Sequence, residues 1–193
     1  MVRLLFAGIA LVVAFSSAAT AADTSWYVGA SVGRTSIHEV CDKAGGTGLV
    51  QSCKDNTSSY KVYGGYNFTR EYGLEWGYAN LGKAEVISTG SAGTATSETW
   101  AVPITGVYNL PITERLGLVG RAGVYFFKSE SKTTGNLVGP IPAVDDDGIE
   151  AVVGASVSLK VWQNLSLRLD WDHYNDAGPG DVDTLLGGVH WRF

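Results

Sequence analysis

The end of the sequence, Leu185-Leu186-Gly187-Gly188-Val189-His190-Trp191-Arg192-Phe193, decides the fold. An apolar residue or glycine occupies every second position of this stretch, up to Trp191 and Phe193, and Arg192, His190 and Gly188 stand between them. Leu186 is the one apolar exception. A period of two indicates a β-strand with one apolar face and one mostly polar face. Such a strand needs neighbours, so further segments with the same alternation are expected.

Seven other segments of the sequence alternate in the same way. They are residues 26–33, 60–68, 73–81, 100–110, 116–128, 149–160 and 165–174. Pro103 lies within the fourth segment, and because proline cannot donate a backbone hydrogen bond, we expect a bulge or weak pairing there. Together with the closing segment, the sequence predicts eight strands.

Ionised side chains fall in only one of the two phases of these strands, except at strand ends. They are Lys61, Glu75, Arg121, Glu150, Arg168, Asp170, Asp172 and Arg192. A Lys or Arg on a lipid-facing surface costs about 2–4 kcal/mol at the bilayer midplane. The apolar phase is therefore expected to face lipid and the charged phase a closed lumen. In a water-soluble sandwich, the polar face would look outward instead.

Five tryptophans lie in the apolar phase, several of them near strand ends. They are Trp26, Trp76, Trp100, Trp171 and Trp191. Indole rings favour the boundary between membrane and water, so this pattern predicts an aromatic girdle. The alternative is a stripe of tryptophans in the core of a soluble protein.

Composition and connection lengths indicate one all-β domain. The chain has 193 residues, 25 of them glycine, and a net charge of −5 with only 14 Lys and Arg, so no nucleic-acid partner is expected. Tight connections at residues 69–71, 111–115 and 162–164 alternate with long ones at roughly 35–58, 82–98 and 129–147, and one near 175–181 is intermediate. This predicts an eight-stranded antiparallel up-and-down transmembrane β-barrel whose long loops face the exterior.

The first residues have the features of a cleavable signal peptide. Arg3 gives a positive start, residues 4–15 are apolar, and Ala19-Thr20-Ala21 fits a cleavage site. A membrane anchor is the alternative, but the apolar run is short. We therefore expect a signal peptide over 1–21 and an outer-membrane barrel domain over 22–193.

Several segments resemble the membrane domain of OmpA-type or opacity-type small outer-membrane barrels. They are Trp26-Tyr27-Val28-Gly29-Ala30, Gly64-Gly65-Tyr66-Asn67-Phe68, Leu74-Glu75-Trp76-Gly77-Tyr78, Leu110-Pro111-Ile112-Thr113 and residues 185–193. The resemblance implies a place in the bacterial outer membrane, in contact with its lipid and lipopolysaccharide. A closing strand that ends in Phe193 resembles the insertion signal read by the barrel-assembly machinery. Many relatives carry a peptidoglycan-binding domain after the barrel, and no such role is expected for this chain, which stops at Phe193.

Cys41 and Cys53 are the only cysteines, and both fall in the first long connection. An exported chain meets an oxidising periplasm, so the pair predicts a disulfide. A zinc site with His38 and Asp42 is the alternative, but two thiols with one nearby histidine make a poor one. We expect no metal and no cofactor.

Glu75, Arg121, Arg168 and Asp170 are expected to meet inside the barrel, because buried charges need partners. The resemblance favours Glu75 with Arg168 as the closest pair. Such a network would pack the lumen, or it would act as the gate of a small pore. An eight-stranded barrel is just wide enough to be filled by side chains, so free conduction is not favoured.

The expected function is non-enzymatic: a structural or surface-interaction role, in envelope integrity or in adhesion to a host or protein partner through the loops. A narrow pore for small molecules is the alternative. A lipid A-modifying enzyme is a further one, since some eight-stranded barrels use a His–Ser pair for that chemistry. Here Asp172-His173-Tyr174-Asn175 has a histidine but no serine two residues on, and a nucleophile beside its base is the minimum requirement.

Overall fold

The computed structural model describes residues 25–37, 50–54, 56–88, 94–134, 146–177 and 180–193, and none of these residues forms a helix. The strands are β1 Ser25–Ile37, β2 Val50–Lys54, β3 Asn56–Asn67, β4 Tyr72–Ser88, β5 Thr94–Pro111, β6 Leu116–Thr134, β7 Asp146–Lys160, β8 Leu165–Tyr174 and β9 Val182–Arg192. The expected signal peptide lies outside the described residues.

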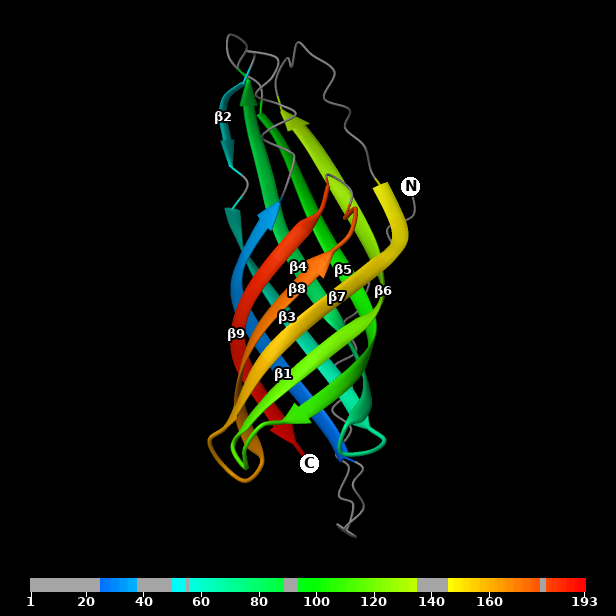
Figure 1. The fold of residues 1–193 in the computed structure, drawn as a ribbon. Coiled ribbons are helices and arrows are strands. Elements are labelled where there is room, and N and C mark those ends of the chain that lie inside the picture. Colours follow the sequence, from blue (N-terminus) through cyan, green and yellow to red (C-terminus); the bar gives the residue numbers. More distant parts are fainter. Residues whose placement is uncertain (1–24, 38–49, 55, 89–93, 135–145, 178–179) are drawn as a thin grey trace, which may run out of the picture.

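Eight of these strands close into an antiparallel barrel (Figure 1). Each pairs with the next in chain order, from β3 to β9, and β1 pairs with both β3 and β9. The last pairing closes the cylinder, with Val28 opposite Trp191 and Arg34 opposite Leu185. This confirms the predicted eight-stranded barrel. The short β2 is a ninth strand that pairs with the far end of β4 and is not part of the closed wall.

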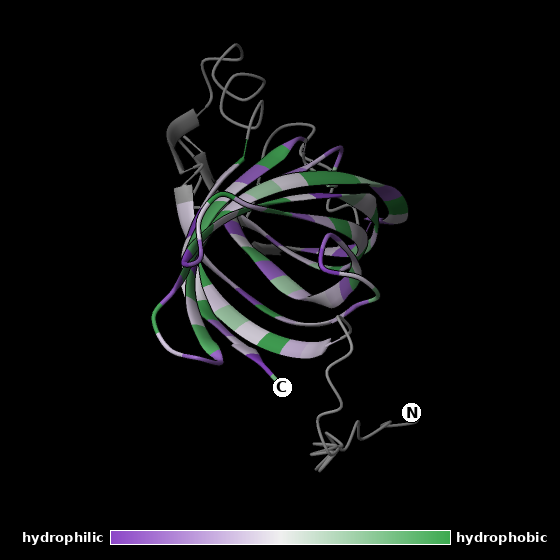
Figure 2. Cartoon of the chain, turned by 60° about the horizontal axis from the view of Figure 1, so that its bottom comes forward, coloured by the Kyte–Doolittle hydropathy of each residue, from purple (hydrophilic) through white to green (hydrophobic). Residues whose placement is uncertain are grey.

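The barrel is apolar outside and charged inside. Leu167 on the outer wall is 47% exposed, whereas Arg121 and Asp170 in the lumen are 6% and 0% exposed. Figure 2 shows hydrophobic and hydrophilic positions alternating along the strands, as a period of two requires. A water-soluble sandwich would have the opposite arrangement, so the outer wall is built to contact lipid.

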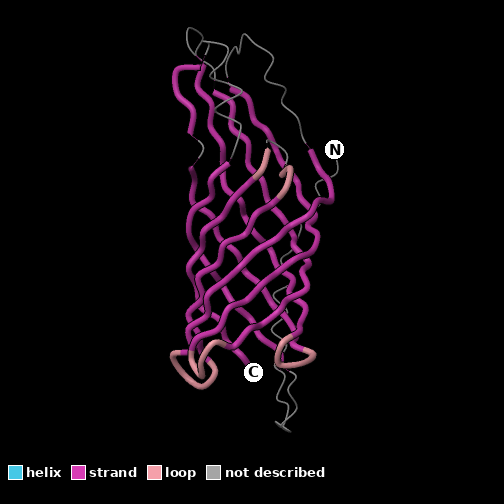
Figure 3. The backbone as a smooth tube through the Cα atoms, viewed as in Figure 1, coloured by secondary structure: helices cyan, strands magenta, loops and turns pink. Residues whose placement is uncertain are grey.

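Three short turns lie at one end of the barrel, which is called here the turn end (Figure 3). They connect β3 to β4, β5 to β6 and β7 to β8, as the sequence predicted. Two use the same device: Thr69 Oγ1 accepts a hydrogen bond from Tyr72 N at 2.9 Å, and Thr113 Oγ1 accepts one from Leu116 N at 2.9 Å. A threonine at the same place in each turn thus satisfies a backbone donor.

At the opposite end, the strands are longer than the sequence predicted. β4, β5 and β6 have 17, 18 and 19 residues. The pairing of β5 with β6 continues to Thr94 opposite Thr134. The expectation that 82–98 and 129–147 are loops throughout was therefore wrong, and so was the loop over 35–58, which contains the end of β1, all of β2 and the start of β3. These segments are rich in Ser and Thr, and Thr is β-branched and fits a strand that has a paired neighbour.

A bulge in β4 marks the start of this extension. Asn80 lies opposite Trp100, but Gly82 lies opposite Thr99, so one residue of β4 is extra. Gly82 has a φ of 95°, and its N–H donates to Oδ1 of Asn80 at 2.9 Å. The bulge shifts the alternation by one residue, so that Leu81 and Gly82 are both buried and Lys83, which would otherwise face inward, is exposed.

The pairing between β4 and β5 is interrupted beside Pro103. Partners are found at Trp76–Ile104 and again at Ala79–Ala101, with none between. Proline has no N–H to give to this ladder. The expectation of weak pairing at Pro103 is confirmed.

We call the end of the barrel opposite the turns, where β4, β5 and β6 are prolonged, the extended end. The lumen near this end holds an apolar layer. Large side chains from several strands pack together there, and the largest are Tyr125, Phe127, Tyr174, Ile37, Leu81 and Val182. The rings of Tyr125 and Tyr174 meet edge to face at 5.0 Å. Side chains therefore fill this part of the lumen.

Candidate functional site

Six ionised side chains converge in the middle of the lumen. They come from β3, β4, β6 and β8, and they are Lys61, Glu75, Arg121, Arg168, Asp170 and Asp172. Three are positive and three are negative, so the set is neutral. Their side chains are 0–5% exposed. We call them the charge network.

Arg168 and Glu75, the pair expected from the sequence, lie together across the lumen. Nη1 of Arg168 is 2.8 Å from Oε2 of Glu75, and Nη2 donates to Oε1 at 3.3 Å. The Tyr27 hydroxyl also donates to Oε2 of Glu75, at 3.2 Å, and the Arg168 guanidinium lies 4.7 Å from the centre of the Tyr63 ring. A bidentate pair of this kind fixes geometry as well as charge.

Arg121 connects the Arg168–Asp170 pair to the Lys61–Asp172 pair. Its Nη1 is 2.9 Å from Oδ1 of Asp170, and its Nη2 is 2.6 Å from Oδ1 of Asp172. Asp170 also meets Nε of Arg168 at 2.7 Å, and Asp172 meets Nζ of Lys61 at 2.7 Å. Every buried charge therefore has at least one opposite charge within hydrogen-bond distance, which is what burial demands.

The sequence interpretation named four members of this network and omitted Lys61 and Asp172. Both were placed in the charged phase, and Asp172 follows Asp170 by two residues on the same face of β8. That spacing was the available signal. The two remaining residues of the charged phase, Glu150 and Arg192, lie near strand ends and are exposed.

Neighbouring side chains pack closely around the network, whose own side chains are 0–5% exposed. The cavity that Lys61, Tyr63, Glu75 and Arg121 help to line has a volume of about 10 Å³, roughly the smallest that holds one water molecule. On the side of the turns, by contrast, a cavity of about 540 Å³ opens. We call it the vestibule. The lumen therefore has three layers: vestibule, charge network and apolar layer.

The predicted tryptophans all belong to the outer phase. Trp26, Trp76, Trp171 and Trp191 are exposed, and Trp100 is half-buried and stacks on Tyr78 with 6.1 Å between ring centres. Their role as a girdle stays a prediction. Trp162, which the sequence interpretation left out, is exposed in the turn between β7 and β8.

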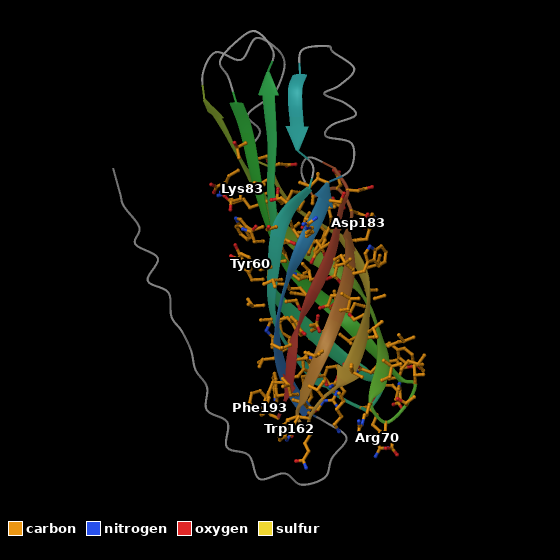
Figure 4. The ribbon with its side chains drawn as sticks, turned by 90° about the vertical axis from the view of Figure 1, so that its left-hand side faces the viewer. Tyr60, Arg70, Lys83, Trp162, Asp183 and Phe193 are labelled. Carbon is orange, nitrogen blue, oxygen red and sulfur yellow. The ribbon has the colours of Figure 1, made fainter. Side chains whose placement is uncertain are left out.

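His173 belongs to the outer phase of β8 and lies beside Asp183, which is found toward the end opposite the turns (Figure 4). Its Nδ1 is 2.9 Å from Oδ1 of Asp183, and its ring stacks on Trp171 at 6.3 Å. Among the described residues, no hydrogen bond joins this ring to a hydroxyl or thiol.

The other predicted sites are only partly described. Cys41 lies outside the described residues, and the side chain of Cys53 does too, so the disulfide stays a prediction. Phe193 is exposed, and its backbone N–H donates to the Trp26 carbonyl at 3.0 Å, which extends the closing pair of strands to the last residue. Within the described ranges, no group of three His, Cys, Asp or Glu residues could hold a metal ion.

Comparison with known proteins places these features in one family. The profile of the OmpA-like transmembrane domain matches residues 21–185. Outer membrane protein A of Escherichia fergusonii and that of Shigella dysenteriae are each 27% identical over 200 residues, which cover 96% of this chain and 54% of each relative. The chain thus spans about half the length of the curated relatives it matches.

Two solved structures share the fold. OprG from Pseudomonas aeruginosa has a TM-score of 0.57 at 11% identity, covering 88% of this chain and 95% of that one. Ail, the attachment invasion locus protein of Yersinia pestis, has a TM-score of 0.52 at 14% identity, covering 88% and 97%. At such identities the likeness is one of architecture.

Proposed function

Because the chain belongs to the OmpA-like transmembrane domain family, we propose that it is a non-enzymatic barrel of the bacterial outer membrane with a structural or surface-interaction role. The barrel is its membrane anchor, and the outer wall sits among lipid and lipopolysaccharide. The extended end faces the exterior, as long connections do in outer-membrane barrels. That end contributes to envelope integrity or contacts a host or protein partner.

The filled lumen is the observation that carries this proposal. The charge network is buried, with a cavity of about 10 Å³ beside it, and the apolar layer follows it toward the exterior. A barrel filled in this way holds its shape in the membrane and offers no open path for solutes. What remains for function is the wall and the two ends. The extension of β4, β5 and β6 beyond the bulge makes the exterior end the larger one.

Shortening the exterior connections tests the proposal. Residues 89–93 and 135–145 are replaced by short Gly-Ser links, and the control replaces residues 162–164 at the turn end. Cells lacking the protein, complemented with each variant, are measured for adherence to host-cell surfaces and for detergent resistance. We expect the exterior variant to lose adherence but restore resistance. A deletion strain unchanged in both measurements would contradict the proposal.

A narrow pore is the second candidate function, and the vestibule is the observation that favours it. A cavity of about 540 Å³ already leads from the turn end to the charge network. Conductance across a planar bilayer separates the two functions. We expect no steady current from the wild-type protein. A steady open state that disappears in Glu75→Gln or Arg168→Gln would instead favour the pore.

A lipid A-modifying activity is tested through His173. If the protein is non-enzymatic, lipid A from a strain carrying His173→Ala has the same mass spectrum as lipid A from the wild type. Loss of a lipid A modification in that strain would revive the enzyme hypothesis.

A further inference from the structure

The vestibule is a large, partly open space at the turn end of the lumen. Its inner end is formed by Tyr27 and Arg168, which both donate hydrogen bonds to Glu75 of the charge network. Its wall is formed by residues of the strand ends near the turns and by residues of the turns themselves. A volume of about 540 Å³ falls within the range of small-molecule sites.

The lining of the vestibule is strongly cationic. Five basic residues contribute to it: Arg70, Arg115, Lys160, Arg168 and Arg192. Glu114 is the only acidic residue among the lining residues. The charge of Arg168 is matched by Glu75 and Asp170 within the network. The other four basic residues come from two turns and from the ends of β7 and β9, so they approach the opening from different sides of the barrel.

Neutral hydrogen-bonding groups complete the wall. Asn109 Nδ2 donates to Asn67 Oδ1 at 3.1 Å, and both residues line the vestibule. His190 lines it too, is 8% exposed, and lies with its ring 4.6 Å from that of Tyr27. Nδ1 of His190 has no hydrogen-bond partner among the described residues. A buried polar atom left unpaired costs free energy.

We propose that the vestibule binds a phosphate ester that enters from the turn end. Clustered basic side chains in a narrow opening concentrate anions. Guanidinium groups match the oxygens of a phosphate with two parallel hydrogen bonds. The volume exceeds that of a bare phosphate, and the amide groups suit the hydroxyl groups of a small polyol. Two sources offer this chemistry: a water-soluble phosphate ester, or the headgroup of a phospholipid in the adjacent leaflet.

The test uses the full folded protein in maltoside micelles, which contain no phosphate. One arm adds glycerol 3-phosphate, the other adds dihexanoyl phosphatidylglycerol, and glycerol is the uncharged control. Two-dimensional NMR follows the amides of Val107 and Val119 and the ring of His190. We expect a saturable shift with a dissociation constant in the millimolar range. A response to glycerol 3-phosphate indicates a soluble ester, and a response to the lipid alone indicates a headgroup.

Variants distinguish binding in the vestibule from nonspecific attraction of the anionic probe to basic side chains. Lys160→Gln combined with Arg192→Gln is expected to weaken binding at least about ten-fold. The control combines Lys83→Gln in β4 with Lys128→Gln in β6, which removes two exposed cations and should leave binding unchanged. Figure 4 labels Lys83, which lies at the end opposite the turns. The shift of gel mobility on heating checks that each variant is folded. No saturable shift with either probe, an equal shift with glycerol, or wild-type affinity in the vestibule variant would overturn the proposal.

Discussion

Each ionised side chain inside this barrel is stabilised by an ion-pair partner, and only some of these partners could be predicted from the sequence. Phase alone placed Glu75 and Arg168 in the lumen, and the family resemblance paired them. Phase could not show that Arg121 joins Asp170 to Asp172, because that contact depends on how far across the lumen each side chain reaches. Strand periodicity predicts the face on which a residue lies, whereas cross-lumen pairing depends on the register of the closed barrel.

Removing one charge of the Glu75–Arg168 pair is expected to be costly. Arg168→Gln leaves Glu75 buried with a weaker partner, and loss of one member of a buried pair costs about 3–5 kcal/mol. Changing both residues to Gln should cost less than the sum of the single changes. Urea unfolding from lipid vesicles, followed by tryptophan fluorescence, measures this. Glu150→Gln, an exposed carboxylate of the same phase, is the control. Additive losses in the double variant would show that the two charges are not coupled.

Two glycines are expected to be intolerant of any side chain. Gly29 lies opposite Tyr63, and Gly65 lies opposite Tyr27. A Cβ at either glycine would overlap the ring of the facing tyrosine. Overpacking of this kind costs about 1–3 kcal/mol, so Gly29→Ala should lower the free energy of unfolding by that amount. The control is Gly187→Ala on the outer wall, where a Cβ would meet nothing within 4 Å. Equal stabilities of the two variants would contradict the prediction.

Strands could be predicted from the sequence as long as their alternation was unbroken. The prediction for β4 ended at Leu81, next to the bulge, although the strand continues to Ser88. The extra residue shifts the phase of the alternation. A strand predicted from alternation therefore ends where the phase changes. Thr-rich ends such as that of β5 were missed for a different reason. They have no apolar face of their own, and they are strands because β4 and β6 supply partners.

The bulge itself should be required for the extension. Gly82→Ala would place a methyl group against Thr57, at a φ of 95° that L side chains rarely adopt. We expect faster hydrogen exchange in β4 and β5 beyond the bulge, while the barrel below stays protected. Gly106→Ala is the matched control, because its Cβ would meet only the Ala122 carbonyl, at an ordinary 3.7 Å. If exchange beyond the bulge is as slow in Gly82→Ala as in this control, Gly82 is not what supports the extension.

At the scale of the whole molecule, the two ends of the barrel have different tasks. The turn end has short turns fixed by Thr69 and Thr113 and surrounds the cationic vestibule. The other end has an apolar layer in the lumen and the long β4–β5–β6 extension. The closed apolar wall spans the membrane, so one end of the barrel faces the exterior and the other faces the periplasm. The roles proposed for the two ends depend on which end is outside.

Thiol labelling of intact cells decides this orientation. In a background with Cys41→Ala and Cys53→Ala, one variant carries Lys83→Cys in the extension and another carries Arg115→Cys in a turn. Both positions are exposed, at opposite ends of the barrel. Because the strands cross the membrane and long connections face outward in such barrels, a membrane-impermeant reagent should label Lys83→Cys at once. Arg115→Cys should react only after the outer membrane is made permeable. The reverse order would place the vestibule outside, and its ligand would then come from the surroundings of the cell.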